Sequence, residues 1–177
     1  FNRDGKNIRN KPAMGGGALM DIGCYGVNVS RMVFGSEPKR VIGLFDRDPE
    51  FQVDRLCSAI LDFPNGQASF VCGTQQVPYQ RVHILGSKGR VEIEIPFNAI
   101  PNDRMRIFID DGSDLRSKGV RVIEAPACDQ YTIQGDVFSR AVLNEGKVAV
   151  PLEDSRKNMR VIDALFRSGD SGHWETP

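Results

Sequence analysis

The architecture of this chain is set by the stretch Gln80-Arg81-Val82-His83-Ile84-Leu85-Gly86-Ser87-Lys88-Gly89-Arg90-Val91-Glu92-Ile93-Glu94-Ile95. Its last six residues alternate between charged and apolar side chains, which is the period-2 pattern of a half-buried strand. Ser87-Lys88-Gly89 separates this segment from the preceding apolar one and is typical of a hairpin turn. The stretch therefore predicts two antiparallel strands joined by a tight turn.

Similar segments lie on both sides of this hairpin. Pro64-Asn65-Gly66 and Asp110-Asp111-Gly112 supply further turn signals. The predicted strands cover residues 39–45, 56–63, 67–74, 80–85, 90–95, 104–109 and 120–124. Short strands joined by tight turns indicate an antiparallel or mixed sheet rather than βαβ units.

Three helices complete the pattern. The first is predicted over residues 17–34 and ends before Gly35, with an apolar packing stripe. That stripe consists of Leu19, Ile22, Gly26, Val29 and Val33. Asp129 caps a second helix over 129–145, and a third over 152–168 stops at Gly169. The expected fold is α+β: an open, mostly antiparallel or mixed sheet of six to seven strands with helices on one face.

The second face of the predicted sheet also carries apolar residues. Phe45, Phe63, Phe70 and Phe108 are spread over the strands, among valines and isoleucines. Since an apolar open sheet face usually has a partner, we expect a homodimer or tetramer formed through this face.

The first helix is entered through the stretch Gly15-Gly16-Gly17-Ala18-Leu19-Met20-Asp21-Ile22-Gly23-Cys24-Tyr25. Asp21 and Tyr25 are four residues apart, so they share a helix face, and Asn28 falls in the same sector. Glycines let a substrate or another backbone come close. This pattern predicts a site for a small polar molecule. Met20 stands where a dinucleotide fingerprint needs its third glycine, and Pro12 precedes where a strand is needed, so a tight packing loop is the preferred interpretation.

Several segments together resemble the C-terminal domain of the Gfo/Idh/MocA (glucose-fructose oxidoreductase-like) family. Beside the Gly-Asp-Gly-Tyr block, they are Asn7-Ile8-Arg9, Glu37-Pro38, Leu85-Gly86-Ser87-Lys88-Gly89, Pro151-Leu152-Glu153-Asp154-Ser155 and Val161-Ile162-Asp163-Ala164-Leu165. The resemblance implies a substrate-binding and oligomerisation domain like the C-terminal domain of glyceraldehyde-3-phosphate dehydrogenase. It also implies an N-terminal Rossmann domain, absent from residues 1–177, that binds NAD or NADP. The substrate implied is a sugar, ketosugar or related polyol.

The same resemblance assigns catalytic roles to Tyr25, as the proton donor or acceptor, and to Asp21. A phenol titrates at about pH 10, so it needs a neighbouring cation, which the family takes as a lysine from the N-terminal domain. From the residues alone, Tyr25 could instead place its ring in the core, and Asp21 could be an exposed first-turn carboxylate that favours the helix dipole. Many family members carry His at the position of Tyr25. A tyrosine at this position resembles the glucose-fructose oxidoreductase and dihydrodiol dehydrogenase branches.

Five further residues are candidates for substrate binding: Arg9, Asn28, Arg31, Tyr131 and Gln134. The alternative for Arg31 is a solvated or salt-bridged side chain. The Tyr-x-x-Gln spacing of Tyr131 and Gln134 resembles a family pattern, but Tyr131, Phe138 and Val142 share a helix face, which favours core packing. We expect this chain itself to hold no cofactor-binding residues.

Composition excludes several classes of protein. The chain has 177 residues, with 23 basic and 23 acidic side chains, so it lacks the charge of a nucleic-acid binder. Apolar stretches are too short to span a membrane, and no metal-ligand spacing occurs. The four cysteines form no Cys-x-x-Cys pair and are expected to be buried thiols. Free thiols favour a cytoplasmic location, and a periplasmic location is the alternative.

Two hypotheses of function follow. In the first, the full-length protein is an NAD(P)-dependent oxidoreductase acting on CH–OH groups, and this chain alone is inactive. In the second, the chain is a non-catalytic dimerisation or ligand-sensing module of the same fold.

Overall fold

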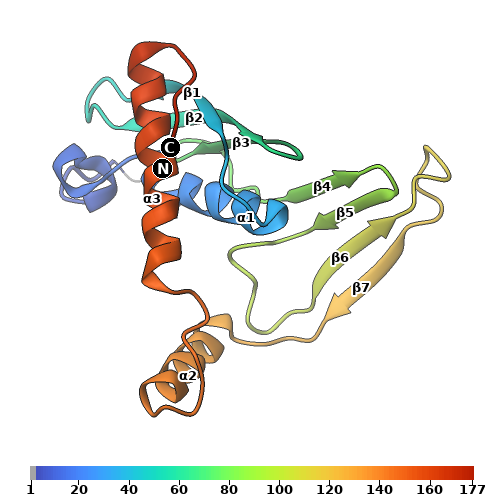
Figure 1. The fold of residues 1–177 in the computed structure, drawn as a ribbon. Helices are drawn as coiled ribbons and strands as arrows, with labels where there is room; N and C mark the ends of the chain where they lie inside the picture. Colours follow the sequence, from blue (N-terminus) through green and yellow to red (C-terminus); the bar gives the residue numbers. More distant parts are fainter. Residues whose placement is uncertain (1–2) are drawn as a thin grey trace. The chain divides into compact units, whose positions relative to one another are not determined.

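The computed structural model of the protein describes residues 3–177, which form two compact units. The first comprises the chain up to residue 77 with residues 150–177, and the second comprises residues 78–149 (Figure 1). The elements of the first unit are η1 (Ile8–Asn10), η2 (Pro12–Met14), the π turn η3 (Leu19–Gly23), α1 (Cys24–Phe34), β1 (Arg40–Arg47), β2 (Asp54–Phe63), β3 (Gly66–Gly73) and α3 (Leu152–Ser171). Those of the second are β4 (Val82–Gly86), β5 (Gly89–Ile93), β6 (Met105–Asp110), β7 (Arg121–Ala125) and α2 (Gln130–Val142).

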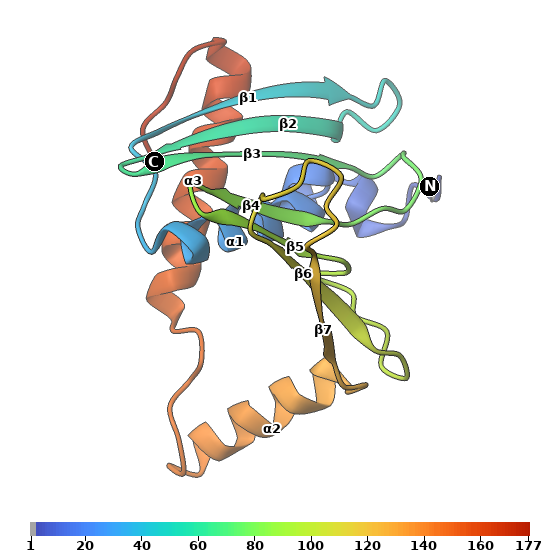
Figure 2. The same ribbon diagram turned by 90° about the vertical axis from the view of Figure 1, so that its right-hand side faces the viewer.

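The first unit is a three-stranded antiparallel sheet covered on one face by two helices. Its strands run in the order β1-β2-β3, and α1 and α3 both pack against the same side (Figures 1 and 2). Fully buried side chains from the turn, the helices and the sheet meet there, and they include Leu19, Val27, Leu61, Ile162 and Leu165. Burying one such side chain contributes roughly 1.5–3 kcal/mol. This core fixes α1, and with it the segment that carries Asp21 and Tyr25.

The α+β class and all seven predicted strands are confirmed, and every strand pair is antiparallel. The strands form two hydrogen-bonded sheets instead of one, in the orders β1-β2-β3 and β4-β5-β6-β7. Residues 74–81 connect β3 to β4 outside either sheet. Pro78 lies in this connection, and it has no N–H to donate to a ladder.

Of the four phenylalanines predicted for the open sheet face, three lie on the covered face of the first sheet instead, and Phe108 lies on β6 in the second unit. Phe63 is buried and stacks on Phe34 with ring centroids 4.4 Å apart, and Phe45 stacks on Phe166 at 5.5 Å. Phe70 packs against α1. Both faces of these strands are apolar in sequence, so alternation alone could not orient them. The outward face of the first sheet carries Leu44, Ile60 and Val71, which are exposed.

The packing stripe predicted for the first helix is wrong by one residue. Beyond Leu19, the fully packed positions are Gly23, Val27 and Ser30, whereas Val33 is exposed. The cause is the π turn, whose i→i+5 hydrogen bonds take one residue more per turn than an α-helix. The fully buried positions after the turn therefore come one residue later than a 3.6 period predicts, although Gly26 still packs against Phe70.

The last helix is longer than predicted. It passes through Gly169 and ends at Ser171, where Gly172 adopts the left-handed conformation with φ +70°. Gly169 lies beneath the ring of Phe45, and a Cβ at this position would overlap that ring. This glycine is thus a packing contact inside the helix instead of its stop signal.

The second unit is a four-stranded meander followed by α2. One face of its sheet carries an ion-pair ladder that includes Arg90–Asp110 at 3.0 Å and Arg104–Glu124 at 2.9 Å. The prediction that α2 packs in the core is wrong. No residue of this helix is buried, and Tyr131, Phe138 and Val142 are all exposed. Cys128, just before α2, is exposed as well, unlike the buried Cys57 and Cys72. Among residues 3–177, no helix is both long and apolar enough to cross a membrane.

Candidate functional site

Tyr25 is the second residue of α1, and its side chain points away from the core. The residue is 48% exposed, which excludes the alternative in which its ring is packed in the interior. Asn28, almost one turn further along, is exposed too. The predicted polar sector of this helix therefore exists, and both of these residues are exposed.

Asp21 lies in the π turn just before α1 and forms an ion pair with Arg9. Arg9 Nε donates to Asp21 Oδ2 at 2.7 Å, and the two side chains are 56% and 30% exposed. The pair uses Nε of Arg9 and Oδ2 of Asp21, and both side chains keep exposed surface. The pair thus offers donors and an acceptor side by side, as recognition of neighbouring hydroxyl groups requires.

Backbone hydrogen bonds join the same two segments. The Gly17 N–H donates to the carbonyl of Arg9 at 3.0 Å, and the Asp21 N–H donates to the carbonyl of Gly17 at 3.2 Å. With the ion pair, these bonds close a ring through Arg9, Gly17 and Asp21. A Cβ on Gly16 would overlap the carbonyl of Arg9, so the glycine-rich segment serves close packing of one backbone on another.

Asp54 is a site residue that sequence reasoning missed. It begins β2, is 2% exposed, and accepts the Leu19 N–H on Oδ2 at 2.7 Å. Burial raises the pKa of its carboxyl group, while hydrogen bonds from the Leu19 and Ala18 backbone act in the opposite direction. The carboxylate thus caps the start of the π turn from a strand 35 residues later in the chain. No local sequence pattern predicts a contact over this distance.

Arg31 does not lie with the exposed candidates, and its predicted contact with substrate is corrected. It is 6% exposed, and its guanidinium donates to Glu37, Asp154 and Asn158. The ion pairs with Glu37 and Asp154 measure 2.8 and 2.7 Å. These contacts raise the pKa of Arg31 further, chiefly through the Glu37 hydrogen bond. Arg31 therefore ties α1 to α3, which is the salt-bridged alternative.

Tyr131 and Gln134 lie on α2 in the second unit and are exposed. Asp129 caps this helix by accepting the Tyr131 N–H at 3.0 Å, as predicted. Contact of Tyr131 and Gln134 with substrate stays a prediction.

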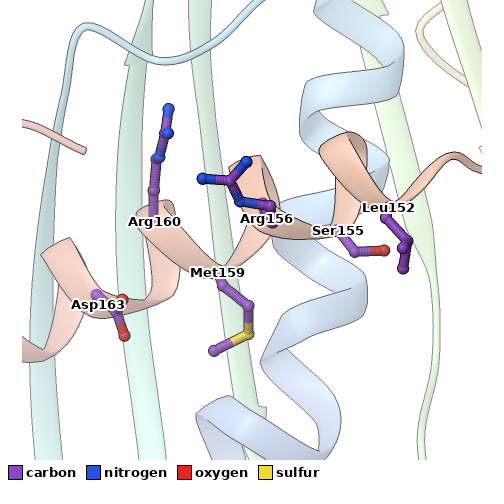
Figure 3. A pocket seen from close by; sticks show the side chains of 6 residues that line it. All are labelled: Leu152, Ser155, Arg156, Met159, Arg160 and Asp163. Atoms are coloured by element: carbon purple, nitrogen blue, oxygen red, sulfur yellow. The ribbon is translucent and has the colours of Figure 1, made fainter.

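A shallow hollow of about 400 Å³ lies along the outer side of α3. Figure 3 shows the side chains that line it, which are Leu152, Ser155, Arg156, Met159, Arg160 and Asp163. None of the residues predicted for the site contributes to this hollow. It also offers no phenol or imidazole for proton transfer.

The glycine-rich segment, residues 15–17, does not have the strand-turn-helix setting of a Rossmann fingerprint. Both sheets are antiparallel, and the helical turn η2, not a strand, precedes Gly15. Residues 3–177 also contain no group of three or more His, Cys, Asp or Glu side chains placed to hold a metal ion.

Comparisons with known proteins place this geometry in context. The model of a family described as the GFO/IDH/MocA C-terminal domain matches residues 1–92. An uncharacterised oxidoreductase of Rhizobium meliloti is 41% identical over 176 residues, covering 99% of this chain and 53% of the relative. D-xylose 1-dehydrogenase (NADP(+)) 2 of Haloferax volcanii is 30% identical over 172 residues, covering 94% of this chain and 50% of the relative.

Solved structures share the fold. An aldose-aldose oxidoreductase from Caulobacter crescentus, complexed with glycerol, has a TM-score of 0.80 at 27% identity and covers 99% of this chain and 52% of its own. A 3-ketoreductase from Actinomadura kijaniata, in complex with NADP, has a TM-score of 0.83 at 23% identity, covering 94% and 50%. The chain spans about half the length of the relatives it matches.

Proposed function

Because this chain belongs to the Gfo/Idh/MocA family of oxidoreductases, we propose that it is the substrate-binding and oligomerisation domain of an NAD(P)-dependent enzyme. The reaction is oxidation of a carbinol, or reduction of a carbonyl, in a sugar, ketosugar or related polyol. A D-xylose dehydrogenase and an aldose-aldose oxidoreductase among the relatives support this substrate class.

The observation that carries the proposal is the exposed Tyr25 in the first turn of α1, four residues after the Asp21 that pairs with Arg9. Tyr25 Oη exchanges a proton with the reacting oxygen of the substrate. Asp21 Oδ1 accepts from a substrate hydroxyl, the terminal nitrogens of Arg9 donate to a neighbouring one, and Asn28 extends this polar surface. General acid–base transfer of this kind contributes roughly 10²–10⁴-fold to a rate.

NAD or NADP is the cofactor of the full-length protein, and it is held mainly by a Rossmann domain outside residues 1–177. An NADP-dependent relative supports this assignment. When bound, the nicotinamide supplies or accepts the hydride at the substrate carbon. A lysine of that domain is the cation that favours the ionised phenol of Tyr25.

The outward face of the first sheet is the proposed oligomer interface. Leu44, Ile60 and Val71 lie on three adjacent strands and are 76%, 41% and 65% exposed. A row of exposed branched apolar side chains on a sheet is a surface that pairing with a second copy would bury.

The test is to compare turnover by the full-length protein and its Tyr25→Phe variant, using a panel of aldoses, ketoses and inositols with NAD and NADP. We expect kcat to fall at least about 100-fold, because the phenyl ring cannot exchange a proton. Tyr79→Phe is the matched control, since Tyr79 is 74% exposed and lies in the second unit. Equal turnover by Tyr25→Phe at every pH would remove Tyr25 from the mechanism, and a wild type inactive on the whole panel would favour the non-catalytic module.

A further inference from the structure

The buried carboxylate of Asp54 has no direct access to substrate, yet it touches the segment that carries the proposed site. We propose that Asp54 is a positioning residue, which holds the start of the π turn η3 and so fixes where the Arg9–Asp21 pair and Tyr25 lie. This inference rests on the proposed function and adds to it a residue that acts through the backbone.

The contacts of Asp54 are concentrated at the first residues of the turn. Oδ2 accepts the Leu19 N–H at 2.7 Å, and Leu19 itself is fully buried. Gly17 has φ +114°, and a Cβ there would overlap Oδ1 of Asp54. The carboxylate is thus fitted against a backbone that few residues other than glycine can adopt.

The turn is held from its exposed side as well. Arg9 binds the carboxylate of Asp21 and accepts the Gly17 N–H on its carbonyl oxygen. Asp54 therefore fixes the core side of the turn, while Arg9 fixes the solvent side. The residues between these two anchors, 18 to 21, have little freedom to shift along the helix axis.

The alternative to the π turn is an ordinary α turn with one residue fewer. Reaching it would shift the segment before the turn by one residue relative to α1, which is a rotation of ~100° about the helix axis. Such a rotation would move Gly17, and the Arg9 carbonyl that accepts its N–H, relative to Tyr25 on α1. A π turn is stable only where its surroundings favour it, and the hydrogen bond from Leu19 to Asp54 supplies such a constraint.

The carboxylate of Asp54 is held at this place at some energetic cost. Burial raises the pKa of Asp54, so ionisation of this group opposes folding, even though the Leu19 and Ala18 N–H groups offset part of that cost. In return for this cost of burying a charge, the carboxylate anchors the segment that carries the proposed site.

The experiment compares Asp54→Ala with Asp48→Ala in the full-length enzyme. Asp48 is the matched control, because it is 6% exposed and accepts the backbone N–H groups of Glu50 and Phe51 at 2.8 and 2.9 Å, in the loop before β2. Each variant loses one buried carboxylate that caps backbone. Amide hydrogen exchange, kcat and KM are measured well below the melting temperature.

For Asp54→Ala we expect faster exchange in the peptide covering residues 17–25, and a kcat about ten- to hundredfold lower, as displacement of reacting groups by an ångström produces. KM for the nicotinamide cofactor stays unchanged. For Asp48→Ala the faster exchange is confined to residues 49–53, and kcat stays within twofold of wild type. If Asp54→Ala does not fold, Asp54→Asn, which keeps one oxygen for the Leu19 N–H, is measured for the same pattern with smaller changes.

Three results would overturn the inference: unchanged exchange over residues 17–25, unchanged kcat despite faster exchange there, or an equal loss of kcat in Asp48→Ala. Each of them requires an active wild type. Failure of the proposed function is a different result, namely a wild type that turns over no polyol, and it would overturn the positioning role as well.

Discussion

Replacing Arg31 should lower the stability of the fold. Its guanidinium is almost fully buried, and it bonds to two carboxylates from different segments, Glu37 and Asp154. Replacement by methionine keeps much of the side-chain volume but removes every donor. Loss of one member of a buried ion pair costs about 3–5 kcal/mol when the remaining charge stays desolvated.

Here the remaining charges are partly solvated, which lowers the expected cost. The side chains of Glu37 and Asp154 are 43% and 35% exposed, so water can replace part of what Arg31 provides. We therefore expect Arg31→Met to lower the free energy of unfolding by about 2–3 kcal/mol. For a chain of this length, that corresponds to a fall of roughly 5–10 °C in melting temperature.

The assay is thermal unfolding of residues 1–177, followed by circular dichroism, with Arg55→Met as control; KM is measured on the full-length protein. Arg55 pairs with Asp46 at 2.9 Å, but both side chains are well exposed, at 38% and 50%. Its replacement should cost less than about 1 kcal/mol. The reasoning would be refuted if Arg31→Met melted within 2 °C of Arg55→Met, or if it left stability intact and raised KM for substrate instead.

Three further outcomes are expected. The buried guanidinium of Arg31 holds the pKa of Glu37 below its usual 4.5. A carboxyl group whose pKa is lower in the folded state contributes stability at pH values above its unfolded pKa. The stability gap between wild type and Glu37→Gln should then be full at pH 7 and should close as the pH falls from 4.5 through the folded pKa of Glu37, as urea titrations at each pH would measure. Leu44→Arg should shift the full-length protein to a smaller species in light scattering, whereas Val77→Arg, also exposed but off the sheet, should not. Gly26→Ala should lower stability by about 1–2 kcal/mol, because a Cβ there lies 2.9 Å from a β3 phenyl ring, whereas Gly135→Ala, with open space around it, should not.

Local patterns located the strands because each strand is specified by its own residues. The hairpin β4–β5 follows from alternation over residues 90–95 and from Ser87-Lys88-Gly89, and it forms where that pattern predicts. The cap of α2 at Asp129 is equally local, since the bond reaches two residues along the chain. Such features need no knowledge of distant segments.

The site depends on partners that are remote in sequence, and these could not be predicted. Leu19 meets Asp54 35 residues later, and Arg31 meets Asp154 123 residues later. A single sequence holds no signal that pairs such positions. The predicted residues Asp21 and Tyr25 came from spacing and family resemblance, whereas the groups that hold their segment in place came only from the structure.

The π turn shows how one unpredicted local feature changes the interpretation of a whole helix. Counted from Leu19 with an α period, the inward positions include Val29 and Val33, and this frame is entirely apolar or glycine. The frame that is actually buried contains Ser30 and is bordered by the charged Arg31, so sequence alone assigns it to the wet side. It can be buried because Glu37 and Asp154 satisfy Arg31, and because the turn supplies the extra residue. The phase of α1, the burial of Arg31 and the exposure of Tyr25 are therefore one structural choice, and a change that restores the α period should disturb all three together.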